Sequence, residues 1–357
     1  MSRLLTTVSA ITVIAGTYVN ADVPKVIADI APIHSLVSRV MDGVGEPKLI
    51  VPNETSPHDY RLRPADAQAI EDANLVFWMG EGLTPWMERA LEALNRDTDI
   101  VEFLALEEST RLSFREGALF EAHDDHDEHD DHDKEHDDHD DHDDHDKEHD
   151  DHDDHDDHDD HDKEHDDHDD HDDHDKEHDD HAGHDHGEFD PHAWLSTSNA
   201  KIWLNVIAAK LTSIDPKNAG IYFANASEAR NEIDALDDEI NVMLAPVRGG
   251  KFIVFHDAYQ YFETVYNFPA SGAISLGDAS DPSAARIAEI ANRIKRENID
   301  CVLSEPQFNA GLVETVMGGT DANTQVIDPL GFGIEPGSSL YPKLIRAMAK
   351  SLVDCLK

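Results

Sequence analysis

The chain has 357 residues and a formal net charge of −50 at pH 7, with 28 Lys and Arg against 78 Asp and Glu. A chain this acidic repels phosphates, which argues against a nucleic-acid-binding function. A cation is the small ligand that this charge favours.

The N-terminus has the features of an export signal. Arg3 precedes a mostly apolar run over residues 4–19, and Ala21 ends a small-residue cleavage site. This pattern predicts a secretory signal peptide at residues 1–21. The alternative is an N-terminal strand or anchor helix, but the run is short and Thr-rich for crossing a bilayer.

Short apolar runs alternate with helical patterns through residues 22–122, which we interpret as an N-terminal lobe. Strands are predicted at 24–31, 48–51, 75–79 and 99–101, and helices at 34–42, at 64–71 and from Thr84. The Thr84 hydroxyl is expected to cap the third helix, with Pro85 in its first position. Alternating strands and helices favour parallel pairing in an α/β fold.

Residues 123–186 interrupt this pattern with 21 of the 25 histidines. Their 32 Asp and 5 Glu against 4 Lys give a formal charge of −33. Such a segment cannot enter a core, so we predict a disordered His/Asp-rich loop that binds borderline metals such as zinc, copper or nickel. Auxiliary metal ligands are expected near its ends, at His123, His126, His129, His132, His178, His181, His184 and His186.

The pattern resumes after this tract. Residues 187–214 are expected to complete the N-terminal lobe with a helix at 198–212, and 215–246 to form a helix that links two lobes. Residues 247–357 repeat the α/β alternation as a C-terminal lobe. Its strands are predicted at 251–255, 301–304 and 325–327, and its helices at 258–266, 281–297, 309–317 and up to residue 355.

Two cysteines, Cys301 and Cys355, are present. An even count in an exported chain predicts one disulfide, which would tie the last helix to the strand that begins at Cys301. The alternative is two separate buried thiols.

Three solitary histidines and one aspartate occupy similar places. His58 follows a strand, His192 precedes a helix, and His256 and Asp328 close strands. Ligands of open α/β sheets bind outside the carboxyl ends of strands, and three imidazoles with one carboxylate form an ordinary zinc shell. Taken singly, each histidine is better explained by a surface or capping role, and Asp328 could merely set a turn. His34 is interpreted as structural.

Five segments resemble the zinc-binding subunit of bacterial high-affinity zinc ABC importers, the ZnuA type of solute-binding protein. They are SPHDYRLRPAD at 56–66, DPHAWLS at 190–196, FHDAYQYF at 255–262, SEPQFNAGLVETV at 304–316 and DPLG at 328–331. The His/Asp-rich insertion and the placing of the two cysteines agree with the same family. The resemblance implies two α/β lobes, each with a mainly parallel sheet, joined by a rigid helix with metal between them.

Carried over residue by residue, the resemblance implies that His58, His192 and His256 bind Zn(II) as cargo. Manganese-specific relatives usually have a carboxylate at the position of His256, so this imidazole favours zinc. Some zinc members have Glu just before the first histidine, where this chain has Pro57. Asp328 or water would then complete the shell.

The family implies a monomeric periplasmic protein that delivers zinc to an ABC permease in the inner membrane. The alternatives are a manganese-specific solute-binding protein and a zinc-sequestering protein that acts mainly through the tract. A zinc hydrolase is disfavoured, because HExxH, a nucleophile elbow and a phosphate-binding glycine loop are absent from the sequence, and only Glu305 could serve as a base.

Overall fold

A computed structural model describes residues 23–93, 98–115, 120, 189–275, 282–307 and 310–357. The predicted signal peptide at 1–21 and the His/Asp-rich tract at 123–186, with its eight auxiliary histidines, lie outside the described residues.

The first half of the described chain builds a four-stranded parallel sheet in the order β2-β1-β3-β4. Its strands are β1 (Val26–Ala28), β2 (Lys48–Leu49), β3 (Leu75–Trp78) and β4 (Asp99–Glu102). The connecting helices are α1 (Ala31–Val40), α2 (Pro64–Glu71) and α3 (Pro85–Glu92). β1 and β3 are buried along their whole length, as strands covered on both faces must be.

The second half repeats this arrangement in a parallel sheet of order β6-β5-β7-β8. Its strands are β5 (Phe252–His256), β6 (Ala273–Ser275), β7 (Cys301–Ser304) and β8 (Asn323–Val326). Its helices are α6 (Gln260–Tyr266), α7 (Ala284–Glu297) and α8 (Ala310–Met317). In each sheet the first strand, β1 or β5, is central. The second strand pairs with one edge of it and the third strand pairs with its opposite edge. The carboxyl ends of β5 and β7 therefore border a topological switch point, where α/β proteins bind ligands.

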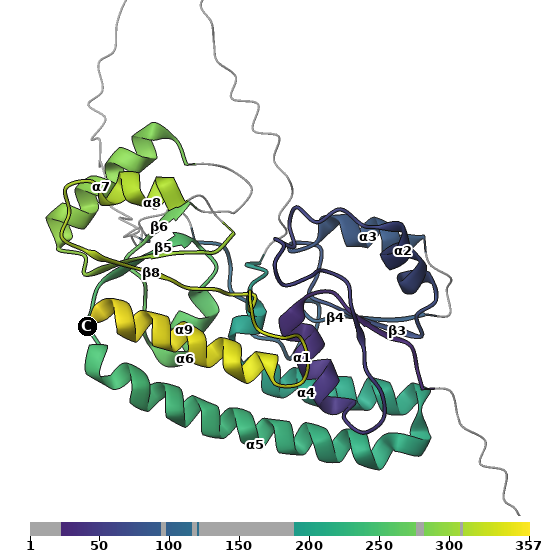
Figure 1. The fold of residues 1–357 in the computed structure, drawn as a ribbon. Coiled ribbons are helices and arrows are strands. Elements are labelled where there is room, and N and C mark those ends of the chain that lie inside the picture. The colour runs from purple at the N-terminus through teal and green to yellow at the C-terminus, as the bar shows by residue number, and fades with distance from the viewer. Residues whose placement is uncertain (1–22, 94–97, 116–119, 121–188, 276–281, 308–309) are drawn as a thin grey trace, which may run out of the picture. The chain divides into compact units, whose positions relative to one another are not determined.

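Three long helices pack together (Figure 1). They are α4 (Thr197–Ile214), α5 (Ala219–Leu244) and α9 (Leu340–Leu356). Short 3-10 turns at Pro216–Asn218 and Ala245–Val247 flank α5. The predicted linking helix at 215–246 thus consists of a 26-residue α-helix with a tighter turn at each end.

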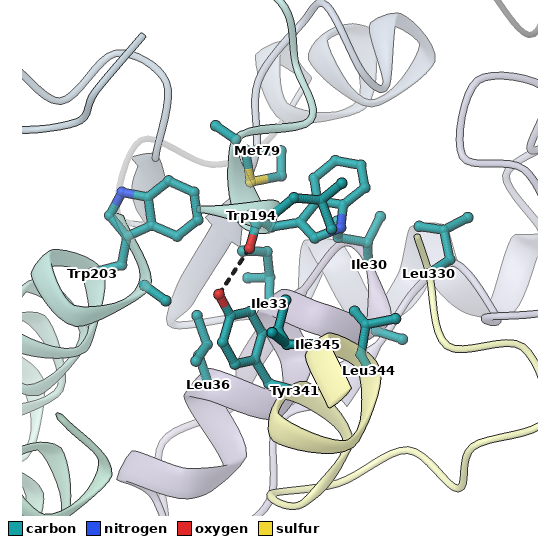
Figure 2. Close-up of a cluster of buried hydrophobic side chains, with 14 of the residues drawn as sticks. Ile30, Ile33, Leu36, Met79, Trp194, Trp203, Leu330, Tyr341, Leu344 and Ile345 are labelled. Atoms are coloured by element: carbon teal, nitrogen blue, oxygen red, sulfur yellow. Dashed lines mark hydrogen bonds between the residues drawn. The ribbon is translucent and has the colours of Figure 1, made fainter. Parts of the chain in front are cut away.

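One hydrophobic core contains residues from both halves of the chain. Figure 2 shows a part of it, in which Ile33 and Leu36 of α1 pack near Tyr341 and Ile345 of α9. The Tyr341 hydroxyl donates to the carbonyl of Trp194 across 2.9 Å. A second cluster, which includes Ile253, Ile290 and Val302, lies under α7 and α8. The shared core means that α1 and α9 stabilise the segment around Trp194 together.

The two cysteines form the predicted disulfide. Cys301 at the start of β7 is bonded to Cys355 near the end of α9. This bond fastens the last helix to a central strand of the second sheet.

Several local predictions needed correction. α1 begins at Ala31 rather than residue 34, because Pro32 fits the first turn of a helix. Thr84 stands at the N-cap of α3, but its side chain makes no capping hydrogen bond and instead accepts from the indole N–H of Trp78. β6 was not predicted, since three residues between loops give too short a periodic signal.

The described helices include none with the length and apolar character needed to cross a lipid bilayer.

Candidate metal centre

His58 lies in the loop between β2 and α2, and the neighbours of this loop hold it firmly. The indole N–H of Trp86 in α3 donates to the carbonyl of Pro57 across 2.8 Å. The Tyr60 hydroxyl donates to Oδ2 of Asp66 in α2 across 2.6 Å. His58 is therefore bracketed by two anchored residues while its own side chain stays partly exposed.

His192 precedes the 3-10 turn Ala193–Leu195 and is 7% exposed. Oδ1 of Asp190 accepts from the backbone N–H of His192 at 3.0 Å and lies 2.7 Å from Nδ1 of its ring. The Tyr261 hydroxyl donates to the Asp190 carbonyl at 2.9 Å. One carboxylate thus fixes both the backbone and the ring of His192.

His256 is the last residue of β5 and is 3% exposed. Its Nδ1 lies 2.6 Å from Oε1 of Glu305, which follows β7 directly. The side-chain amide of Gln307 donates to the other oxygen of Glu305 at 3.1 Å. Because β5 and β7 are paired neighbours, the histidine and its carboxylate meet at the switch point of the second sheet.

The three imidazoles converge. Nε2 of His192 and Nε2 of His256 are 3.4 Å apart, and their ring centroids are separated by 5.2 Å. The ring centroid of His58 lies 5.9 Å from that of His192. A small cavity of about 10 Å³ lies between them, enough for about one water-sized sphere. Its lining consists of Ser56, Pro57, His58, His192, Trp194, His256, Gln307, Pro329 and Leu330.

The carboxylates decide which ring nitrogens can bind an ion. With Nδ1 of His192 and of His256 each donating to a carboxylate, the lone pairs of the two Nε2 atoms point at one another and into the same space. This is the carboxylate–histidine arrangement found behind zinc ligands. Burial raises the pKa of Asp190 to about 7, while the backbone N–H of His192 acts in the opposite direction. The buried carboxylates favour a cation beside them.

Asp328, predicted as a possible fourth ligand, lies beside the cavity lining and not in it. It follows β8 by two residues and does not line the cavity, although Pro329 and Leu330 do. Its Oδ1 accepts from the backbone N–H of Leu330 at 2.9 Å, as in a turn. Burial raises the pKa of Asp328, and the hydrogen bonds that its carboxylate accepts from backbone N–H groups partly offset this rise.

The described part of the chain contains no set of three His, Cys, Asp or Glu side chains already placed to hold an ion. The three histidines are neighbours, but their rings must turn or approach one another before they could share one metal.

Sequence reasoning did not identify Asp190 and Glu305 as the partners of the histidine rings. Asp190 precedes His192 by two residues, so an Asx-type turn in DPH was a local signal for it. Glu305 lies 49 residues from His256, and only the pairing of β5 with β7 brings them together.

Comparisons with known proteins place the chain in a family. The family model "ZnuA: Zinc-uptake complex component A periplasmic" matches residues 26–355. The high-affinity zinc uptake system protein ZnuA of Brucella abortus (strain 2308) is 44% identical over 341 residues, which cover 96% of this chain and 94% of that protein. The protein of the same name from Paracoccus denitrificans (strain Pd 1222) is 42% identical over 338 residues, with coverages of 94% and 93%.

Solved structures share the fold. A crystal structure of ZnuA has a TM-score of 0.65 at 20% identity and covers 94% of this chain and 100% of its own. A Mn-bound periplasmic metal binding protein from Candidatus Liberibacter asiaticus has a TM-score of 0.64 at 17% identity, with the same coverages. The two-sheet α/β architecture predicted from the sequence is thereby confirmed. The chain belongs to the family of ZnuA-type periplasmic components of zinc-uptake complexes.

Proposed function

We propose that this protein captures Zn(II) through His58, His192 and His256 and delivers it for high-affinity uptake. One observation carries the proposal: three imidazoles from distant segments meet at one small cavity, and buried carboxylates hold two of them with Nε2 facing inward. The family model and the relatives named for zinc uptake support the same cargo. A solute-binding role also agrees with the matched family, whose members are components of zinc-uptake complexes and not enzymes.

The donor set fits zinc. Neutral imidazole nitrogen is a preferred ligand of Zn²⁺, whereas sites rich in carboxylate and water suit manganese. The carboxylates Asp190 and Glu305 orient the rings and raise their basicity without occupying the shell. The fourth position falls to water or to Asp328, which would have to give up its turn geometry to reach the cavity.

The cellular setting follows from the proposed cargo role. Residues 1–21 would direct export and be removed, leaving a monomer in the periplasm. Residues 22–122 and 187–214 would form one lobe and 247–357 the other, joined by the helix at 215–246. A modest movement of the lobes would release zinc to an ABC permease in the inner membrane.

The tract at 123–186 would act as an auxiliary zinc-binding or regulatory loop. Its aspartates raise the affinity of neighbouring imidazoles for protons as well as for metal, so binding there should weaken as pH falls. Several weakly held ions near the main site would raise the local zinc concentration. Alternatively, the tract would sense excess zinc and slow its uptake.

Two variants test this assignment in a zinc titration with manganese competition. A variant with His58, His192 and His256 all changed to Ala should lose the single tight zinc site and keep weak binding by the tract. A variant lacking residues 124–185 should keep the tight site and bind fewer ions in total. Unchanged tight binding in the triple variant would support sequestration by the tract instead. Preference for manganese in the tract-deleted protein would support a manganese carrier.

A further inference from the structure

Residues 110–115, which we term the strap, connect the two halves of the described chain. At one end, the backbone N–H of Thr110 donates to Oδ1 of Asn199 in α4 at 2.8 Å, and the Asn199 amide donates back to the Thr110 carbonyl at 3.0 Å. Further along, the backbone N–H of Leu112 donates to the Tyr261 hydroxyl in α6 at 3.0 Å. The strap therefore runs from α4 to α6.

Two arginines of the strap stack on Phe120 and Phe189, the aromatic residues on either side of residues 121–188. The guanidinium of Arg115 lies 3.5 Å from the ring centroid of Phe120, and that of Arg111 lies 4.9 Å from the ring centroid of Phe189. Ser113 and Phe189 form an antiparallel bridge. The described residues on both sides of the His/Asp tract are thus attached to the strap.

Arg115 also holds two carboxylates of the second half. Its Nε donates to both oxygens of Asp257 at 3.0 Å, and Nη1 and Nη2 donate to Glu263 at 2.8 and 3.1 Å. The side chains of Asp257 and Glu263 are only 7% and 5% exposed, and that of Arg115 is 17% exposed. One partly buried cation therefore neutralises two buried carboxylates, which have too little contact with water for solvent to replace it.

Asp257 follows His256 directly, where β5 ends in a turn. The backbone N–H of Ala258 donates to the His256 carbonyl at 3.0 Å, so the position of Asp257 sets the backbone from which His256 extends. Contacts run without a break from Phe120 to Arg115, from Arg115 to Asp257, and from Asp257 to the turn that holds His256.

We infer that Arg115 is a positioning residue for the zinc site, which acts through Asp257 on His256 and is itself held by Phe120 beside the tract. The inference rests on the proposed role of His256 as a zinc ligand. Loss of the guanidinium leaves Asp257 and Glu263 as uncompensated buried charges that repel each other, which displaces the turn after β5. A ligand displaced in this way binds metal more weakly, and changes behind metal ligands typically cost about 10- to 100-fold in affinity.

The test measures zinc affinity and dissociation rate in the full-length protein by competition with a chelator. Arg115→Gln should raise the zinc Kd at least about tenfold, mainly through faster dissociation, and Arg115→Lys should fall between Gln and wild type because lysine lacks the planar fork. Arg111→Gln is the matched control: the same substitution in the same strap, at an arginine stacked on Phe189. It should leave the Kd within about twofold of wild type. Equal Kd values for the Arg115→Gln variant and wild type would overturn the inference.

Two further variants separate positioning from a general loss of folding. Adding Glu263→Gln to Arg115→Gln removes one of the two uncompensated buried charges and should recover part of the thermal stability, while dissociation stays fast because Asp257 still lacks its partner. Phe120→Ala should speed dissociation and Phe120→Tyr should not, since a phenol ring also stacks on the guanidinium. If zinc affinity falls in these variants only in proportion to their melting temperatures, Arg115 stabilises the fold but does not position His256, and the inference is overturned. If the triple histidine variant still binds zinc tightly, the proposed function fails and this inference fails with it. An unchanged Kd in Arg115→Gln, with tight binding lost in the triple variant, overturns this inference alone.

Discussion

Nδ1 of His256 lies 2.6 Å from Oε1 of Glu305, a contact that joins the carboxyl ends of the paired strands β5 and β7. The Glu305 side chain is fully buried, so its charge is balanced locally rather than by water. A metal ion bound to Nε2 of His256 would place a positive charge near the Glu305 carboxylate. The affinity of the site for metal therefore depends on Glu305, although this residue is not a metal ligand.

Glu305→Gln should lower zinc affinity about tenfold or more, because an amide oxygen can still accept from Nδ1 but carries no charge to raise the basicity of the ring. Chelator competition would measure the change. Glu239→Gln provides a matched control, since Glu239 pairs with Arg346 near the surface. Equal affinities in the Glu305 and Glu239 variants would show that the buried carboxylate does not support the site.

Asp328→Asn should weaken zinc binding less than His192→Ala or His256→Ala does. The carboxylate of Asp328 accepts from the Leu330 backbone and does not line the cavity, whereas both histidines do. Zinc titration of the three single variants ranks them. A loss for the Asp328 variant as large as for either histidine would identify this carboxylate as the fourth ligand.

Burial raises the pKa of Asp29 to about 7, against the hydrogen bonds that it accepts from the backbone of Ile30 and Met79. Between about pH 4 and pH 7 the folded protein keeps a proton that the unfolded chain has released, so this group makes folding less favourable as pH rises through that window. Above the window the cost is constant.

Denaturant unfolding of wild type and Asp29→Asn across this range would show the effect. The stability of wild type relative to the variant should decrease with rising pH, by at most about 1.4 kcal/mol per pH unit for one proton. A difference that stays level from pH 4 to pH 7 would mean that Asp29 is ionised in the folded protein throughout.

Tyr341→Phe should destabilise the protein by about 1–3 kcal/mol, because it leaves the buried carbonyl of Trp194 without its hydroxyl donor (Figure 2). Equilibrium unfolding in urea measures this directly. Zinc affinity should fall as well, since Trp194 lines the cavity beside His192. Tyr60→Phe, which removes a hydroxyl bonded to Asp66, gives a comparison in the loop that carries His58.

Replacing Cys301 and Cys355 together by Ala should lower the unfolding free energy by about 4 kcal/mol, the loop-closure term for a separation of 54 residues. Affinity for zinc should change little, because the bond joins the start of β7 to α9, and Glu305 follows the opposite end of that strand. Unfolding curves with and without a reductant, run on both proteins, would check the value. A wild type insensitive to reduction would contradict it.

The sequence by itself determined the alternation of strands and helices, because apolar periodicity and residues such as Pro64 and Pro85 act within a few positions along the chain. It also singled out His58, His192 and His256, since each stands apart from the tract, in a loop or at the boundary of an element. The sequence could not show which residues far apart along the chain lie close together in the folded protein. The pairing of β5 with β7 put Glu305 behind His256, the strap put Arg115 on Asp257, and the turn of Asp328 kept that carboxylate out of the cavity lining. These relationships depend on strand order and on packing between segments tens to hundreds of residues apart, which only the tertiary structure decides.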